Sequence, residues 1–334
     1  ELSAVVRAAG AVALFSADDA PALGLPRSRV EDAFLDGVIL LSSTDDGLDR
    51  RRYLEVYKLR SAQHMTGRHS LVLGPTGVEI FPRYRSGAPQ PARSLPRRRL
   101  STGVPGLDDL LGGGLLERSV TLVSGSPGAG KTTLALHFLL AGAAAGEPGL
   151  MIVLEESAEQ ILANAEALGL DLRDAIERGL VEVLRVSKQE VRADQIPAVV
   201  GAQVAAHGTS RLAFDGLGHA GDARFAPWEL AQLLYELAHQ LKDLGVTSMF
   251  ALESRSLDAF EAAIDDAGLS PAADNLLLLR YRDAGGALAA TLTVVKARGT
   301  AHDHGHHAIG VERGGLRLAD APDRPVDESA RRNS

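Results

Sequence analysis

The sequence predicts an α/β protein whose mostly parallel central sheet is flanked by helices and gains antiparallel strands at one end. Short apolar, β-prone runs recur in the second half of the chain, and helical patterns such as Ala158–Gly169 and Ala226–Gly245 separate the earlier ones. This alternation favours parallel pairing, because a crossover helix returns the chain to the same edge of the sheet. The last runs are joined by short turns, which predicts antiparallel pairing there. The runs are Leu150–Leu154, Val181–Val186, Arg211–Phe214, Thr247–Leu252, Asn275–Tyr281 and Ala290–Ala297.

Length and composition are those of a globular protein with about two domains. Of the 334 residues, 45% are hydrophobic and 23% are charged, and the net charge of −8 gives no global reason to expect nucleic-acid binding. The absence of cysteine excludes disulfides and cysteine-ligated zinc. No signal peptide and no apolar run of membrane-spanning length is visible, so we expect a cytoplasmic protein without membrane contacts.

The beginning of the chain reads as a helix followed by strands, and a linker comes after them. Residues 86–100 are rich in proline, serine and arginine and show no period, which predicts a linker. The run Arg97–Arg99 is interpreted as a solvated part of this linker rather than as a nucleic-acid patch. The elements expected before it are a helix over Glu1–Gly10, strands at Ala11–Asp18, Asp36–Leu41 and Tyr53–Arg60, and a hairpin over His69–Phe81 with Gly74–Gly77 as its turn.

A phosphate-binding loop is the clearest motif in the chain. An apolar, β-prone run leads into the pattern G-x-x-x-x-G-K-[ST], and a helical run follows. The glycines Gly125, Gly128 and Gly130 are expected to take positive φ, so that backbone N–H groups close around an anion at the helix N-terminus. Lys131 would reach the β- and γ-phosphates, and the Thr132 hydroxyl would ligate Mg²⁺. The residues expected to contact the phosphates are Gly125, Ser126, Pro127, Gly128, Ala129, Gly130, Lys131, Thr132 and Thr133.

The chain also contains an internal repeat. Asp36–Leu41 resembles Asp274–Leu279, and Lys58–His64 resembles Lys296–His302. The number of residues that separates the two similar segments is the same in both cases. Glu1–Gly10 resembles Glu236–Gly245 at nearly that interval. A register kept over such a distance indicates duplication of one domain.

The repeat predicts the domain layout. Residues 1–85 are expected to be the second half of a first domain, whose phosphate loop would precede Glu1, so that the chain is a fragment. Residues 101–320 are expected to be the complete second copy, and residues 321–334 a disordered polar tail.

The complete copy resembles the ATPase domain of the KaiC family of clock proteins, within the RecA-like P-loop ATPases. Nearly all of the chain up to about Ala319 takes part in this resemblance, apart from the linker. The resemblance implies a RecA-like P-loop NTPase fold, two tandem domains, and ATP with Mg²⁺ as ligands. The residues that carry it are Gly106–Gly114, Gly125–Thr133, Glu155–Ser157, Phe214–Asp215 and Lys296–His302.

Three acidic residues end strand-like runs and are candidates for the chemistry of hydrolysis. Hydrolysis needs a carboxylate that orients and deprotonates the attacking water. Glu155 and Glu156 end the run LMIVLEE, and the family resemblance implies that this pair supplies the catalytic carboxylate, although which of the two is the base stays open. The alternative is that the pair only caps the next helix. Asp215 ends the run RLAFD and would hold Mg²⁺ through water, or else serve as a turn residue.

A second group of polar residues lies near the end of the complete copy. Strand alternation would place Lys296 and Arg298 on one face, where two cations are costly unless an anion meets them. The family resemblance implies that Lys296, Arg298, Thr300 and His302 reach the ATP of a neighbouring subunit, and therefore that the protein forms a homo-hexameric ring. Their equivalents in the first copy are Lys58, Arg60 and His64.

The sequence therefore favours a KaiC-like ATPase that hydrolyses Mg-ATP at the subunit interfaces of a ring, with a signalling or regulatory output and signalling proteins as partners. The alternatives are a RecA-type DNA recombination or repair ATPase, a serine/threonine autokinase, and a nucleotide-binding module without catalysis. Ser270 retains one of two hydroxyls that accept phosphate in the clock protein, whereas Pro271 replaces the other. The cluster His302–His307 is interpreted as a polar turn rather than as a metal site.

Overall fold

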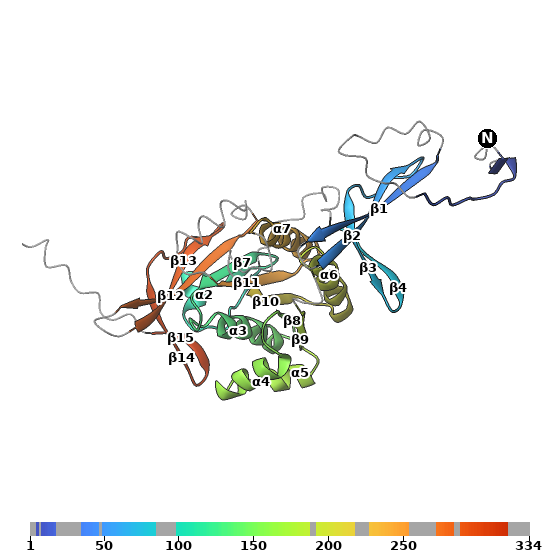
Figure 1. The fold of residues 1–334 in the computed structure, drawn as a ribbon. Coiled ribbons are helices and arrows are strands. Elements are labelled where there is room, and N and C mark those ends of the chain that lie inside the picture. The colour runs from blue at the N-terminus through green and yellow to red at the C-terminus, as the bar shows by residue number, and fades with distance from the viewer. Residues whose placement is uncertain are drawn as a thin grey trace, which may run out of the picture. The chain divides into compact units, whose positions relative to one another are not determined.

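A computed structural model describes residues 5–6, 8–17, 35–46, 49–84, 98–187, 192–217, 227–253, 272–283 and 288–319 (Figure 1). The chain divides into two compact units, Glu1–Arg83 and Tyr84–Ser334. Each unit is described by itself. The candidate Ser270 lies outside the described residues.

The second unit is built on a nine-stranded sheet with the order β15-β14-β13-β12-β7-β11-β10-β8-β9. The six strands from β12 to β9 pair in parallel, and the three pairs from β12 to β15 are antiparallel. The predicted α/β class, with antiparallel strands at one end, is confirmed. The strands are β7 Val120–Gly125, β8 Gly149–Val153, β9 Val181–Arg185, β10 Arg211–Leu217, β11 Thr247–Glu253, β12 Asn275–Asp283, β13 Leu288–Ala297, β14 His307–Glu312 and β15 Gly315–Leu318.

Helices cover both faces of this sheet (Figure 1). One apolar cluster joins Leu134 and Phe138 with residues of the next two helices, and a second cluster contains Val200 and Leu237 on the other face. None of the helices in the described ranges is long and apolar enough to cross a bilayer. The helices are α2 Leu107–Leu110, α3 Lys131–Ala144, α4 Ala158–Ala167, α5 Leu172–Glu177, α6 Ile196–His207 and α7 Pro227–Asp243.

The interpretation of the arginine run as a solvated part of the linker is wrong for Arg99, whereas the Arg98 side chain is 57% exposed although it forms an ion pair. Arg98 forms an ion pair with Glu147, whose other oxygen accepts a hydrogen bond from the buried Arg211 at 2.7 Å. Arg99 lies in the short strand β5 (Arg99–Leu100), which pairs with β6 (Leu115–Leu116). Arg98 and Arg99 therefore fix the start of β5 to the rest of the second unit. The Glu147 carboxylate meets the Arg98 guanidinium group, and oxygen acceptors on other segments meet that of Arg99.

The first unit contains a four-stranded antiparallel sheet in the order β1-β2-β3-β4. The strands predicted at Asp36–Leu41 and Tyr53–Arg60 and the hairpin are confirmed, and Gly74 pairs with Gly77 across the turn. The strand predicted over Ala11–Asp18 is wrong for Ala11–Ala17, which has no regular structure and leaves Val12 and Leu14 exposed. The run is apolar, as many strands are, but no strand in the described ranges pairs with it. The strands are β1 Gly37–Asp46, β2 Asp49–Leu59, β3 Arg68–Gly74 and β4 Gly77–Phe81.

The small sheet repeats the pairing of β12 to β15 in the register of the internal repeat. Gly37 pairs with Leu59 as Asn275 pairs with Ala297, and both pairs of strands carry a register shift one residue later. The pairings between β2, β3 and β4 correspond in the same way to those between β13, β14 and β15. The similarity seen in the sequence therefore extends to the register of every strand pair in the small sheet.

A buried histidine predicts how the stability of the second unit depends on pH. His137 of α3 accepts a hydrogen bond from the N–H of Leu316 at 2.9 Å, and burial lowers the pKa of His137. The folded protein therefore favours the neutral ring, whereas the unfolded chain takes up a proton below about pH 6.5. We expect the contribution of neutral His137 to the free energy of unfolding to be complete above about pH 6.5. Below that pH it should be lost at up to about 1.4 kcal/mol per pH unit.

Urea unfolding at pH 7.5 and pH 5 measures this loss. His137→Gln keeps a side-chain oxygen that can accept a hydrogen bond but cannot titrate, so its midpoint should fall less than that of the wild type. Equal falls in both proteins would show that His137 does not contribute to the pH dependence.

Candidate functional site

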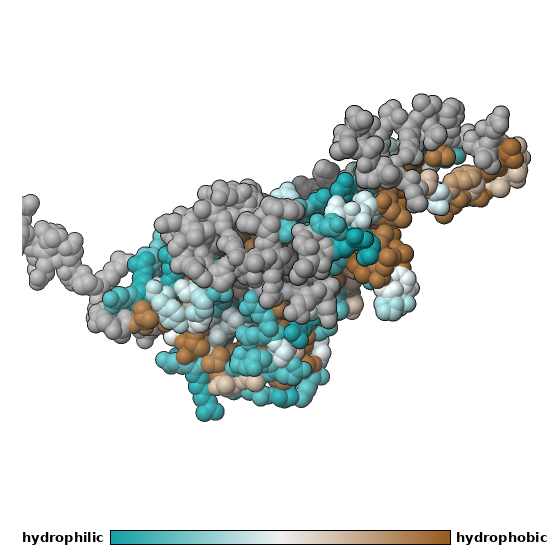
Figure 2. All heavy atoms as spheres, viewed as in Figure 1, coloured by the Kyte–Doolittle hydropathy of each residue, from teal (hydrophilic) through white to brown (hydrophobic). Residues whose placement is uncertain are grey.

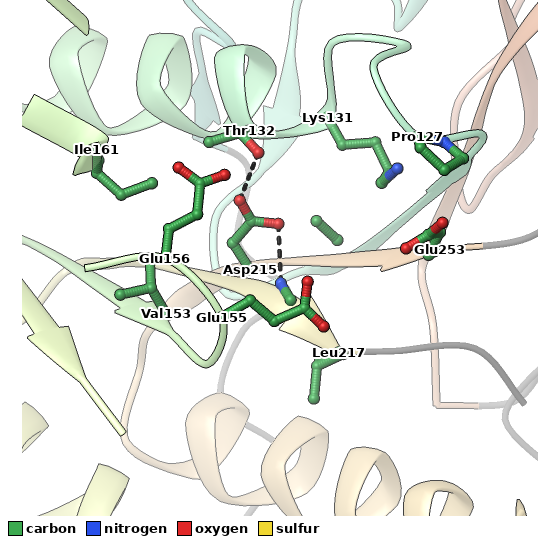
Figure 3. Close-up of a pocket in the computed structure, with 12 residues that line it drawn as sticks. Pro127, Lys131, Thr132, Val153, Glu155, Glu156, Ile161, Asp215, Leu217 and Glu253 are labelled. Atoms are coloured by element: carbon green, nitrogen blue, oxygen red, sulfur yellow. Dashed lines mark hydrogen bonds between the residues drawn. The ribbon is translucent and has the colours of Figure 1, made fainter. Parts of the chain in front are cut away.

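The candidate site is a cavity of about 200 Å³ at the carboxyl edge of the parallel strands (Figure 3). The loop after β7, the first turn of α3 and the ends of β8, β10 and β11 bring its walls together, as is usual for ligand sites of open α/β sheets. Its lining residues are Pro127, Lys131, Thr132, Val153, Glu155, Glu156, Ile161, Asp215, Gly216, Leu217, Ala251 and Glu253.

The phosphate loop has the predicted backbone at two of its three glycines. Gly128 has φ +76°, and Gly130 has φ +97° at the N-cap of α3. The expected positive φ at Gly125 is wrong, since Gly125 ends β7 in the sheet. Glycine is required there for a different reason, because a Cβ would lie 2.4 Å from the carbonyl oxygen of Leu279 on the adjacent strand.

Lys131 extends from the first residue of α3 into the cavity. Its Nζ donates to the carbonyl oxygens of Gly125 and Ser126, both at 2.9 Å. Burial lowers the pKa of Lys131, and the carboxylates of Glu253, Asp215 and Glu155 oppose this shift. The ammonium therefore lies against the loop that is expected to hold phosphates.

Thr132 and Asp215 meet directly, although they are far apart in the sequence. The Thr132 hydroxyl donates to Asp215 Oδ2 at 2.5 Å, and the N–H of Gly216 donates to Oδ1 at 2.9 Å (Figure 3). Burial raises the pKa of Asp215, and the bond from Thr132 partly offsets that rise. A hydroxyl and a carboxylate are hard oxygen donors, so this pair fits Mg²⁺.

Glu155 and Glu156 follow the end of β8, and both line the cavity. Burial and then the charge of Asp215 raise the pKa of Glu156, whose Oε2 accepts a hydrogen bond from Asn164 at 3.0 Å. In Figure 3 the carboxylate of Glu156 lies on the Thr132 side of Asp215, and that of Glu155 lies toward Leu217. Helix α4 is capped instead by Ser157, whose hydroxyl accepts the N–H of Gln160.

Two further residues contribute to this edge of the sheet and were not predicted from the sequence. Glu253 ends β11, pairs with Gly125 in the sheet and lines the cavity on the side of Lys131 and Pro127 (Figure 3). It follows an apolar strand, which is the same signal that identified Asp215. Tyr281 of β12 donates its hydroxyl to the carbonyl oxygen of Gly128 at 2.8 Å, and no local pattern indicates this contact.

Lys296 and Arg298 do not line this cavity. They lie at the opposite edge of the sheet, where Lys296 donates to the carbonyl oxygen of Ala273 at 2.9 Å and Arg298 pairs with Asp274 at 3.4 Å. Asp274 also accepts the N–H of Val120, the first residue of the strand that leads to the phosphate loop. The length of β7 therefore separates these cations from the loop by roughly 20 Å.

Thr300 and His302 lie in the turn after β13 and also remain outside the cavity. The Thr300 hydroxyl accepts a hydrogen bond from Arg99, and the His302 ring lies 4.3 Å from the His304 ring, centroid to centroid. Within the described ranges, no three histidine, aspartate or glutamate side chains are grouped so that they could hold a metal ion.

Comparison with known proteins identifies the family. The family model for the KaiC ATPase matches residues 1–85 and 100–322. The chain is 29% identical over 305 residues to the circadian clock oscillator protein KaiC of Parathermosynechococcus lividus, covering 89% of this chain and 54% of that protein. KaiC of Picosynechococcus is 29% identical over 303 residues, covering 88% and 56% of the two chains.

The circadian clock oscillator protein KaiC 1 of Synechocystis is 28% identical over 305 residues, covering 89% of this chain and 56% of that protein. The chain thus spans little more than half the length of these curated relatives. The match to the family model covers most of the chain, and the α/β sheet with its phosphate loop is the RecA-like fold of that family. The chain belongs to the KaiC family.

Proposed function

We propose that the second unit binds Mg-ATP in the cavity and hydrolyses it. The observation that carries this proposal is the meeting of the phosphate loop, the Thr132–Asp215 pair and two glutamates at one sheet edge. Each group has a place in phosphoryl transfer: the loop and Lys131 hold the phosphates, and a carboxylate orients the attacking water.

The charge of the cavity supports a requirement for a metal ion. Among the lining residues in the described part of the chain, Lys131 carries the one positive charge, whereas four are acidic. A nucleotide triphosphate without a metal ion would be repelled by these carboxylates. Thr132 and Asp215 would hold Mg²⁺, which neutralises developing charge on the phosphates when it is bound.

We further propose that the site is completed by a neighbouring subunit of a hexameric ring. Lys296 and Arg298 lie at the sheet edge opposite the phosphate loop of their own chain. They can meet a nucleotide only if it is held by another copy. The homology to KaiC proteins supports such an assembly, with a regulatory output that depends on partner proteins.

Complementation between two inactive variants tests the shared site. Lys131→Ala removes the cation of the phosphate loop, and Arg298→Ala removes the cation offered to the neighbour, so each variant alone should lose most ATPase activity. In mixed rings, an Arg298→Ala copy keeps an intact loop and can receive the intact Arg298 of a Lys131→Ala copy. Random 1:1 mixing should therefore restore about a quarter of the sites.

Phosphate release from the mixture, compared with the sum of the separate variants, measures this recovery. A mixture no more active than that sum would contradict the shared site. Light scattering of the same samples with and without ATP checks that rings form.

We also propose that residues 1–85 are the second half of a KaiC-like domain. Positions that are fully buried in the complete sheet are exposed in the first unit: Ile39 is 57% and Leu41 is 71% exposed, whereas their counterparts Leu277 and Leu279 are 0% exposed. Apolar residues reach the surface of this unit in Figure 2. In the second unit, α3 packs in the same apolar cluster as these positions and β7 pairs with their strand. The exposed leucine and isoleucine of the first sheet therefore indicate half of a domain, whose other half would supply an equivalent helix and strand.

A further inference from the structure

We infer that Arg99 is a positioning residue for the turn that carries Arg298, so that strand β5 helps to set where this cation lies. The inference rests on the proposed role of Arg298 at a neighbouring site. Arg99 itself contacts protein groups and needs no contact with the nucleotide.

Arg99 forms three hydrogen bonds with its guanidinium group. Its Nη1 donates to the carbonyl oxygens of Leu111 at 3.0 Å and Gly114 at 2.7 Å. Its Nη2 donates to the hydroxyl of Thr300 at 2.7 Å. In the sequence, Thr300 lies near the other end of the second unit. The planar guanidinium group of arginine donates at the same time to the carbonyl oxygens of Leu111 and Gly114 and to the Thr300 hydroxyl. A lysine ammonium would meet these acceptors less well.

The turn around Thr300 is also closely packed against the glycine run after α2. A Cβ on Gly112 would lie 2.6 Å from the Thr300 methyl group, so the glycine run after α2 fits directly against this turn. Gly299 has φ +70°, which sets the bend between Arg298 and Thr300. Any displacement of Arg99 or of the glycine run therefore shifts the turn.

Support of the turn matters for Arg298 because its side chain is largely open to solvent. It is 54% exposed, and its ion pair with Asp274 measures 3.4 Å. The backbone N–H of Arg298 donates to the carbonyl oxygen of Asp274 at 2.9 Å, which fixes one side of the turn. Arg99 fixes the other side through Thr300.

Arg99 links this turn to strand β5 at the start of the second unit's sheet structure. It follows the boundary between the two compact units, at Arg83 and Tyr84, and belongs to the first strand of the second unit. Its neighbour Arg98 is anchored separately, on Glu147. Of these two anchors, Arg99 bonds to the turn that carries Arg298.

Variants of the full chain test this inference by two independent measurements. Arg99→Gln and Thr300→Val should each speed amide hydrogen exchange at residues 298–300 by about tenfold or more, because the turn loses its tether. ATPase kcat should fall about tenfold, while the Kd for Mg-ADP in the phosphate loop stays within about twofold. Thr300→Ser retains the acceptor and should keep the slow exchange.

Arg98→Gln is the matched control, since it removes the neighbouring cation without touching Thr300. Its exchange at residues 298–300 should equal that of the wild type. Unchanged exchange in both Arg99→Gln and Thr300→Val would overturn the inference. If Arg298→Ala keeps full activity, the shared-site proposal fails instead, and the exchange measurement still decides the role of Arg99.

Discussion

Replacing both Glu155 and Glu156 with glutamine is expected to lower the rate of ATP hydrolysis by about 100-fold or more while leaving Mg-ATP binding intact. Glutamine keeps the size and the hydrogen-bonding oxygen of glutamate, but it cannot accept the proton of the attacking water. Both side chains line the cavity, whereas the phosphates are expected to contact the loop and Lys131. The loss should therefore appear in kcat, and removing two of four nearby negative charges should not weaken nucleotide binding.

Single-turnover hydrolysis and the binding of a fluorescent ATP analogue measure the two quantities separately. Glu159→Gln is a matched control, because it removes the same charge from the next helix at an exposed position outside the cavity. Comparing Glu155→Gln with Glu156→Gln then identifies the base. If the double variant and the wild type turn over equally fast, the catalytic role of the pair must be abandoned.

The parts of the fold that the sequence predicted share a simple physical cause. The inner parallel strands β7, β8, β10 and β11 are buried for most of their length, so each reads as a short apolar run, and Asp215 follows the buried run of β10. The phosphate loop is equally local, since its glycines, Lys131 and Thr132 all fall within one short, continuous stretch. Such signals need no knowledge of distant contacts.

The features that the sequence did not predict depend on distant partners. Arg99 reads as a linker residue until Thr300 is known to lie beside it. Ala11–Ala17 is an apolar run, as many strands are, but a strand forms only where a neighbour accepts its hydrogen bonds. Glu253 is the exception: it follows an apolar strand, as Asp215 does, and could have been found by the same reasoning.

Two matched leucine substitutions should differ strongly in their effect on the free energy of unfolding. Leu279→Thr in β12 removes a fully buried side chain from the core and places a hydroxyl there, which should cost about 3–5 kcal/mol. That loss is a large fraction of the stability of a typical domain, so the second unit should unfold many degrees lower. Leu41→Thr changes the same position of β1, where the side chain is 71% exposed, and should alter stability by less than about 0.5 kcal/mol.

Urea unfolding followed by far-ultraviolet circular dichroism, together with binding of a hydrophobic dye to the native protein, distinguishes these cases. Leu41→Thr should bind less dye than the wild type at unchanged stability, because it removes apolar surface that is open to solvent. Leu279→Thr should lower the unfolding midpoint and lose nucleotide binding with it, since the Leu279 carbonyl oxygen accepts the N–H of Ser126 in the phosphate loop. If Leu41→Thr were instead as destabilising as Leu279→Thr, the face of β1 would already be covered. The proposal that residues 1–85 form a half domain in need of a cover would then be wrong.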